Sequence, residues 1–85
     1  MSGAGPSVDA DGHLGGLLPG ETALVRRVHG APDFSRRMSE LGLVPGTELR
    51  MVRRAPFGDP IEFVVRGTHF SIRRDEAEGI RVVPP

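Results

Sequence analysis

Apolar residues alternate most regularly in the second half of the chain. Residues 61–66 alternate between two faces, and Phe70 and Ile72 repeat the pattern after a tight turn at Gly67-Thr68. A period of two is typical of a half-buried β-strand. Shorter apolar runs predict three further strands, at residues 22–28, 49–54 and 80–83.

The predicted strand at 22–28 has two consecutive arginines that interrupt its alternation. Ala23 and Val25 are expected on one face of this strand. Leu24 and Val28 are expected on the other face if a bulge is allowed.

One amphipathic segment separates the first two strands. Phe34, Met38 and Leu41 recur at helical spacing, with polar residues between them. Asp33 is the expected N-cap, because its carboxylate can accept hydrogen bonds from the first-turn amides. Gly42 follows the last apolar position and suits a C′ residue with positive φ. The pattern predicts a helix of ~9 residues, which is too short to be stable without packing on a sheet.

Glycine and proline mark the turns. Val44–Thr47 has proline and glycine at the two central positions of a type II turn. Residues 55–60 contain two prolines and a glycine and predict a hairpin connection. Residues 74–79 predict one helical turn that ends at Gly79. The residues assigned to turn geometry, without direct chemistry, are Gly42, Pro45, Gly46, Gly58 and Pro60.

Length and composition predict one small domain. The chain has 85 residues, which leaves no room for a second domain. Residues 1–13 have almost no apolar side chains and predict a disordered tail, so the domain is expected at residues 14–85. About five short strands are expected to curl into a partly open β-barrel with one inserted helix.

Charge and composition exclude several classes of function. Eleven basic and eleven acidic residues give a formal net charge of zero, so no global field attracts nucleic acid or a membrane surface. The absence of cysteine excludes disulfides, thiolate metal sites and a cysteine nucleophile. No catalytic motif is present, which predicts that the protein is not an enzyme. Without a signal peptide or membrane span, a cytoplasmic location is expected, with no direct membrane insertion.

The motifs, in this order, resemble the FeoA family. The likeness extends from about Leu14 to Val83, and the motifs that carry it are Leu41–Gly46, Pro56–Pro60 and Ile72–Ala77. The resemblance implies an SH3-like barrel and a non-enzymatic accessory role in bacterial ferrous-iron uptake. It also implies contact with the cytosolic part of the ferrous-iron permease FeoB, which would recruit the protein to the inner face of the membrane.

Two surfaces are candidates for this contact. Arg36, Arg37 and Glu40 fall on the polar face of the predicted helix, where a partner can dock. Phe57 lies at a hairpin tip, where an exposed aromatic residue can anchor an interface. The structural alternatives are a solvated helix face and a Phe57 side chain packed beneath its own loop.

The histidines lie outside any recognised metal motif. His13, His29 and His69 lack the helical spacing of known ligand pairs. Asp59, Glu62 and His69 are the weak candidates, because a favourable register would bring them together across a hairpin. We therefore expect no tightly bound cofactor, and at most a transient contact with a divalent metal.

RNA binding by a small SH3-like, translation-associated module is the main alternative. Six arginines can form a local basic stripe: Arg50, Arg53, Arg54, Arg66, Arg73 and Arg74. The four phenylalanines are the only aromatic residues and leave little for base stacking, so no nucleic-acid partner is expected. A stand-alone counterpart of the SH3-like domain of iron-dependent repressors is a further alternative. The sequence specifies no oligomeric state.

Overall fold

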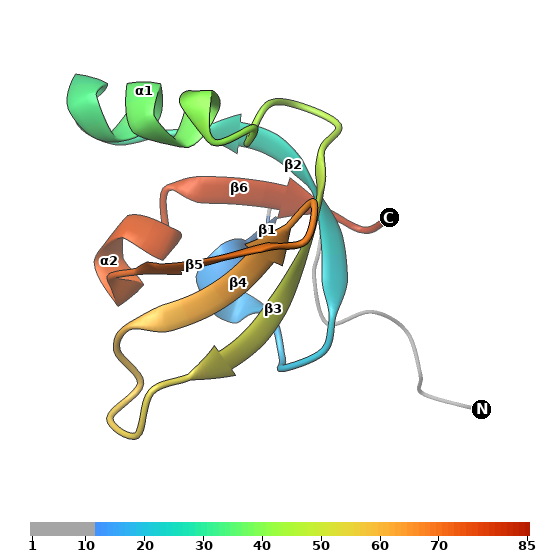
Figure 1. The fold of residues 1–85 in the computed structure, drawn as a ribbon, viewed down its shortest axis with the longest axis vertical. Coiled ribbons are helices and arrows are strands. Elements are labelled where there is room, and N and C mark those ends of the chain that lie inside the picture. The colour runs from blue at the N-terminus through green and yellow to red at the C-terminus, as the bar shows by residue number, and fades with distance from the viewer. Residues whose placement is uncertain (1–11) are drawn as a thin grey trace.

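The computed structural model describes residues 12–85 as one antiparallel sheet with helices at its margins (Figure 1). The strands are β1 (Gly12–His13), β2 (Thr22–Val28), β3 (Glu48–Arg54), β4 (Ile61–Val65), β5 (Thr68–Ile72) and β6 (Ile80–Val83). The helices are the 3₁₀ turn η1 (Leu14–Gly16), α1 (Pro32–Glu40) and α2 (Arg74–Ala77). None of these helices of the described region is long and apolar enough to cross a membrane.

The strand order is β1-β6-β2-β3-β4-β5, so β1 and β5 are the end strands and the sheet is not closed. This arrangement confirms the predicted mainly β, partly open fold with one short inserted helix. It contains six strands rather than the expected five, because β1 was not predicted.

The first strand begins before the predicted domain boundary at Leu14. Gly12 and His13 pair with Val82 and Arg81 and form β1, so their assignment to the tail was wrong. A two-residue edge strand is too short to show an apolar pattern. The rest of the predicted tail, residues 1–11, lies outside the described residues.

The core is built from alternate strand residues and from the segments that cover the sheet. Ile61, Phe63 and Val65 of β4 are buried, as the alternation predicted. The Phe63 ring lies 5.6 Å from the ring of Phe70 on β5, measured between centroids. The other buried apolar residues are Leu14, Leu17, Ala23, Val25, Phe34, Met38, Leu43, Leu49, Met51, Ile72, Ala77, Ile80 and Val82.

A bulge in β2 decides which of its side chains face the core. The pairing of β2 with β6 shifts after Val25, so Val25 and Val28, three residues apart, both contact the core. Ala23 is buried with Val25, as predicted. The placement of Val28 on the same face as Leu24 was wrong, because the extra residue of the bulge reverses the alternation. Both arginines at the bulge are consequently exposed.

The start of α1 differs from the prediction. Pro32 is the first helical residue and Ala31 is the N-cap, without a side-chain hydrogen bond, so Asp33 is not the cap. Proline favours this position because its φ is already helical and it has no N–H to leave unpaired. Asp33 lies in the first turn, where its carboxylate interacts favourably with the helix dipole.

The end of α1 is a Schellman motif. Gly42 has a φ of 100°, and its N–H donates to the Ser39 carbonyl at 3.0 Å, while the Leu43 N–H donates to the Met38 carbonyl at 2.9 Å. These bonds confirm the predicted glycine stop. Leu41, expected on the buried stripe, is 37 % exposed, because it is the C-cap and Leu43 is buried instead.

Three of the turns that lead into strands contain positive-φ residues. Gly46 (φ 92°) follows its proline as a type II turn requires, and Gly58 (φ 82°) lies at the β3–β4 hairpin, both as predicted. The β4–β5 turn is centred on Arg66 (φ 52°) and Gly67 (φ 80°) rather than on Gly67-Thr68. Positive φ at both central residues is the pattern of a type I′ hairpin turn.

Candidate functional site

The predicted docking residues on α1 are exposed, and Arg37 among them also contacts Phe34 and Glu76. Arg36 and Glu40 are exposed. The Arg37 guanidinium lies 5.7 Å from the centroid of the Phe34 ring, and its Nη2 is 3.8 Å from Oε2 of Glu76 in α2. The Arg37 side chain is still 60 % exposed. The polar side of α1 therefore presents basic and acidic side chains to the solvent. Arg37 also connects this side of α1 to α2 through Glu76.

Phe57 is 95 % exposed at the tip of the β3–β4 hairpin, which excludes the alternative that it packs beneath its own loop. The tip is closed by the Gly58 N–H, which donates to the Ala55 carbonyl at 2.7 Å, and the Asp59–Pro60 bond is cis. Figure 1 shows this hairpin and α1 at opposite ends of the long axis. The structure therefore does not bring Phe57 together with the α1 residues.

The weak metal candidates Asp59, Glu62 and His69 do not form a matched ligand set. Oδ1 of Asp59 accepts a bond from the Arg74 N–H at 3.1 Å, and Oε2 of Glu62 accepts from Nε of Arg53 at 2.8 Å. His69 pairs with Val64 and is exposed on the outer face of β5. Residues 12–85 contain no group of three or more His, Asp or Glu side chains that could hold a metal ion.

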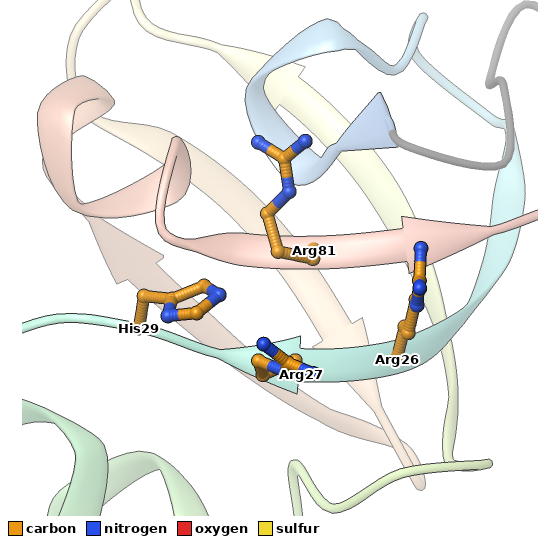
Figure 2. A pocket seen from close by; sticks show the side chains of 4 residues that line it. All are labelled: Arg26, Arg27, His29 and Arg81. Atoms are coloured by element: carbon orange, nitrogen blue, oxygen red, sulfur yellow. The ribbon is translucent and has the colours of Figure 1, made fainter.

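The structure reveals a cationic cleft that the sequence patterns did not identify. Its lining consists of Arg26, Arg27 and His29, from β2 and the residue that follows it, and Arg81 of β6 (Figure 2). We call this the arginine cleft; its volume is about 170 Å³. Arg27 lies directly opposite Arg81 in the sheet, and the His29 N–H donates to the Gly79 carbonyl at 2.7 Å. Backbone pairing therefore fixes where Arg27, His29 and Arg81 lie along the neighbouring strands.

A second cleft adjoins the first at His29. It has a volume of about 310 Å³ and is lined by His29, Gly30, Ala31, Phe34, Asp75, Glu76 and Gly79. We call it the Phe34 cleft. Its wall is apolar at Gly30, Ala31 and Phe34 and acidic at Asp75 and Glu76. The two clefts together form a surface that is cationic at one end and apolar with an acidic rim at the other.

Comparisons with known proteins agree with this fold. Residues 13–84 match the family model described as the FeoA domain. The FeoA protein of Chlorobium tepidum is 44 % identical, with a TM-score of 0.81, covering 85 % of this chain and 69 % of that one. FeoA of Stenotrophomonas maltophilia, complexed with zinc and described as an SH3 domain protein, is 36 % identical, with a TM-score of 0.73 and coverage of 82 % and 87 %.

A curated relative is much longer. The Fe(2+) transport protein A/Fe(2+) transporter FeoB fusion protein of Porphyromonas gingivalis is 35 % identical over 69 residues. The match covers 81 % of this chain and 8 % of that protein. The predicted SH3-like fold is confirmed, and the family match covers nearly all of the described residues. The chain belongs to the FeoA family.

Proposed function

We propose that this chain is a non-enzymatic accessory protein of bacterial Fe(II) uptake that binds the cytosolic part of the ferrous-iron permease. The observation that carries the proposal is the Porphyromonas gingivalis relative, whose name joins an Fe(2+) transport protein A to the transporter FeoB in one polypeptide. Covalent linkage raises the effective concentration of two parts for each other, as is useful when they act in contact. Whether or not the two parts are linked, the contact itself is made through the surface of this domain.

The exposed side chains suit noncovalent contact. Arginine forms bidentate bonds with carboxylates and stacks on planar groups, and Arg36 is exposed on α1. Phe57 offers an exposed aromatic ring at the other end of the molecule. One compact interface covers one of these ends, because the two lie far apart along the molecule (Figure 1). We place the contact at the α1 end, where Phe34 of α1 lines the Phe34 cleft and Arg37 lies 3.8 Å from Glu76 of the same cleft.

A divalent metal has no tight site in this proposal. Zinc is bound by the Stenotrophomonas maltophilia protein, but Asp59 and Glu62 here are bonded to Arg74 and Arg53. The described residues therefore do not fit a closed metal centre. We propose that any metal contact of this chain is transient and has no part in holding the partner.

Isothermal titration calorimetry with the purified cytosolic part of the permease tests the proposal. The full chain is expected to bind, and the double variant Arg36→Glu/Arg37→Glu should weaken binding by about tenfold or more, because it reverses two charges at the docking surface. Arg50→Glu, an exposed charge reversal on β3, is the matched control and should bind like the wild type.

The same titration with Phe57→Ala separates the two ends of the molecule. Unchanged binding is expected, because the contact lies at the α1 end. A loss confined to Phe57→Ala would move the contact to the hairpin, and an absence of binding by the wild-type chain would overturn the proposed function.

A further inference from the structure

We propose that the free edge of β5 pairs with β5 of a second copy of this chain, in an antiparallel register centred on Phe70. In the described region, β5 is an end strand whose only sheet partner is β4. A free strand edge presents backbone N–H and C=O groups with which another strand can pair. This contact goes beyond the proposed function, because it needs neither α1 nor the permease.

The turn before β5 determines which backbone groups face outward. It has two central residues, so the residues on either side of it, Val65 and Thr68, form a hydrogen-bonded pair. Bonded and non-bonded pairs then alternate along the antiparallel ladder. His69 and Ser71 therefore direct their backbone groups away from β4. Outside the ladder, neither residue has a backbone hydrogen bond to another residue of the described region.

β5 lacks the features that usually prevent an edge strand from pairing. Such features include a very short strand, a charged side chain, a proline and a bulge. The other end strand, β1, has only two residues, whereas β5 has five, with no proline and with an uninterrupted register against β4. Apart from β1, β5 is the only described strand without an Asp, Glu, Lys or Arg side chain. Its edge is therefore open to a second strand.

Self-pairing centred on Phe70 gives each outward-facing group a partner. His69 and Ser71 lie on either side of Phe70, so in an antiparallel pair each His69 lies opposite Ser71 of the other copy. These opposed residues exchange N–H···O=C bonds on both sides of the two-fold axis. A register shifted by one residue would place outward groups opposite inward ones, and a larger shift would leave outward groups without a partner in the strand.

Phe70 supplies the apolar part of the contact. Its ring lies 5.6 Å from the ring of Phe63 between centroids, yet Phe70 is only partly buried. In the self-paired register, the two Phe70 residues face each other as a non-hydrogen-bonded pair, in which side chains lie closer together. Aromatic residues in such cross-strand pairs stabilise a sheet. Each Phe70 thus covers the exposed part of the other, which favours a second copy over a strand of unrelated sequence.

The size of the contact predicts weak and reversible association. Stable complexes bury about 1,200–2,000 Å² in total. Two five-residue strand edges supply only a small part of that area. We therefore expect a dimer with a Kd on the order of 1 mM.

Amide hydrogen exchange of the full chain, measured by NMR at several concentrations, tests the proposal. The N–H groups of His69 and Ser71 should exchange more slowly as the concentration rises from about 50 μM to about 2 mM, a range around the expected Kd. Exchange at Phe70, whose N–H bonds to β4, should change little. Sedimentation equilibrium should show dimers forming over the same range. A chain that stays monomeric, or a dimer with protection confined to other residues, would overturn the proposal.

Two substitutions of Ser71 separate pairing from folding. Ser71→Pro removes an outward N–H, and an edge strand tolerates proline where the nitrogen faces away from its neighbour. This variant should weaken the dimer by about tenfold or more, because each copy loses a donor at the contact. The matched control Ser71→Thr keeps the N–H and should associate like the wild type. Wild-type association of a folded Ser71→Pro variant would refute the pairing.

A pair of charge variants tests the register without relying on proline. His69→Lys/Ser71→Lys places like charges opposite each other in the paired strands and should abolish association. His69→Lys/Ser71→Glu places opposite charges at the same positions and should associate at least as tightly as the wild type. Equal association of the two variants would contradict the register centred on Phe70.

Other occupants of the edge would give different results. Protection of His69 and Ser71 at every concentration in a monomeric chain would assign the edge to another segment of the same chain. Weaker permease binding by Ser71→Pro, in a chain that does not self-associate, would assign the edge to the permease. Either result overturns the second-copy contact. The permease titration, run far below the dimer Kd, tests the proposed function independently, so the two proposals can fail separately.

Discussion

At the scale of single residues, two glycines that each follow a helix are required for different reasons. Gly42 and Gly79 were both predicted as helix stops. Gly42 has the positive φ of a C′ residue. Gly79 does not; instead, a Cβ added there would collide with the carbonyl oxygen of His29. The first reason is local and could be predicted, whereas the second depends on a contact between segments far apart in the chain.

Replacing Gly79 with alanine should therefore be costly. Gly79→Ala is expected to destabilise the chain by on the order of 1–3 kcal/mol, because the added methyl group must push the β2 and β6 ends apart. Gly16→Ala is the matched control, since the space around Gly16 is open and no such shift is needed. Urea unfolding compares the two. Equal stability of both variants would show that the close contact at His29 tolerates a side chain.

At the scale of elements, periodicity predicted the type and order of the strands and helices better than their ends. The stripe of Phe34 and Met38 identified α1, but the cap at Ala31 and the exposure of Leu41 did not follow from it. The end of a helix depends on how its free backbone groups are satisfied. At the start of α1, Pro32 has no N–H to leave unpaired, so the helix begins there. The face of Val28 was missed although a bulge was allowed for, because composition does not show at which residue of the strand the bulge lies.

The α1 stop gives a prediction at this scale. Gly42→Val should destabilise the protein by on the order of 1–2 kcal/mol or more, because a β-branched residue is strained at positive φ. Ser39→Val, at an exposed position inside α1, introduces the same side chain with helical backbone and should cost only a few tenths of a kcal/mol. Thermal unfolding followed by circular dichroism measures both, and a melting temperature unchanged by Gly42→Val would contradict the Schellman stop.

At the scale of the whole molecule, a net charge of zero conceals a segregated surface. Positive charge gathers where β2 and β6 meet, and the carboxylates of Asp75 and Glu76 lie beside it on α2. The sequence suggested a basic stripe at other arginines. It did not show that Arg27 and Arg81 are neighbours, because their pairing joins two strands that are far apart in the chain. The family and the fold could be predicted from ordered local motifs, whereas this cleft required the three-dimensional register.

The most direct test of the central claim, that the chain acts by binding the permease at its α1 end, is NMR mapping of that contact. Amide shifts of the labelled chain are followed as the unlabelled cytosolic part of the permease is added. Shifts should cluster on α1, at residues 26–31 and at residues 79–81, while residues 55–60 of the β3–β4 hairpin remain unchanged. An absence of shifts, or shifts confined to the hairpin around Phe57, would contradict the claim.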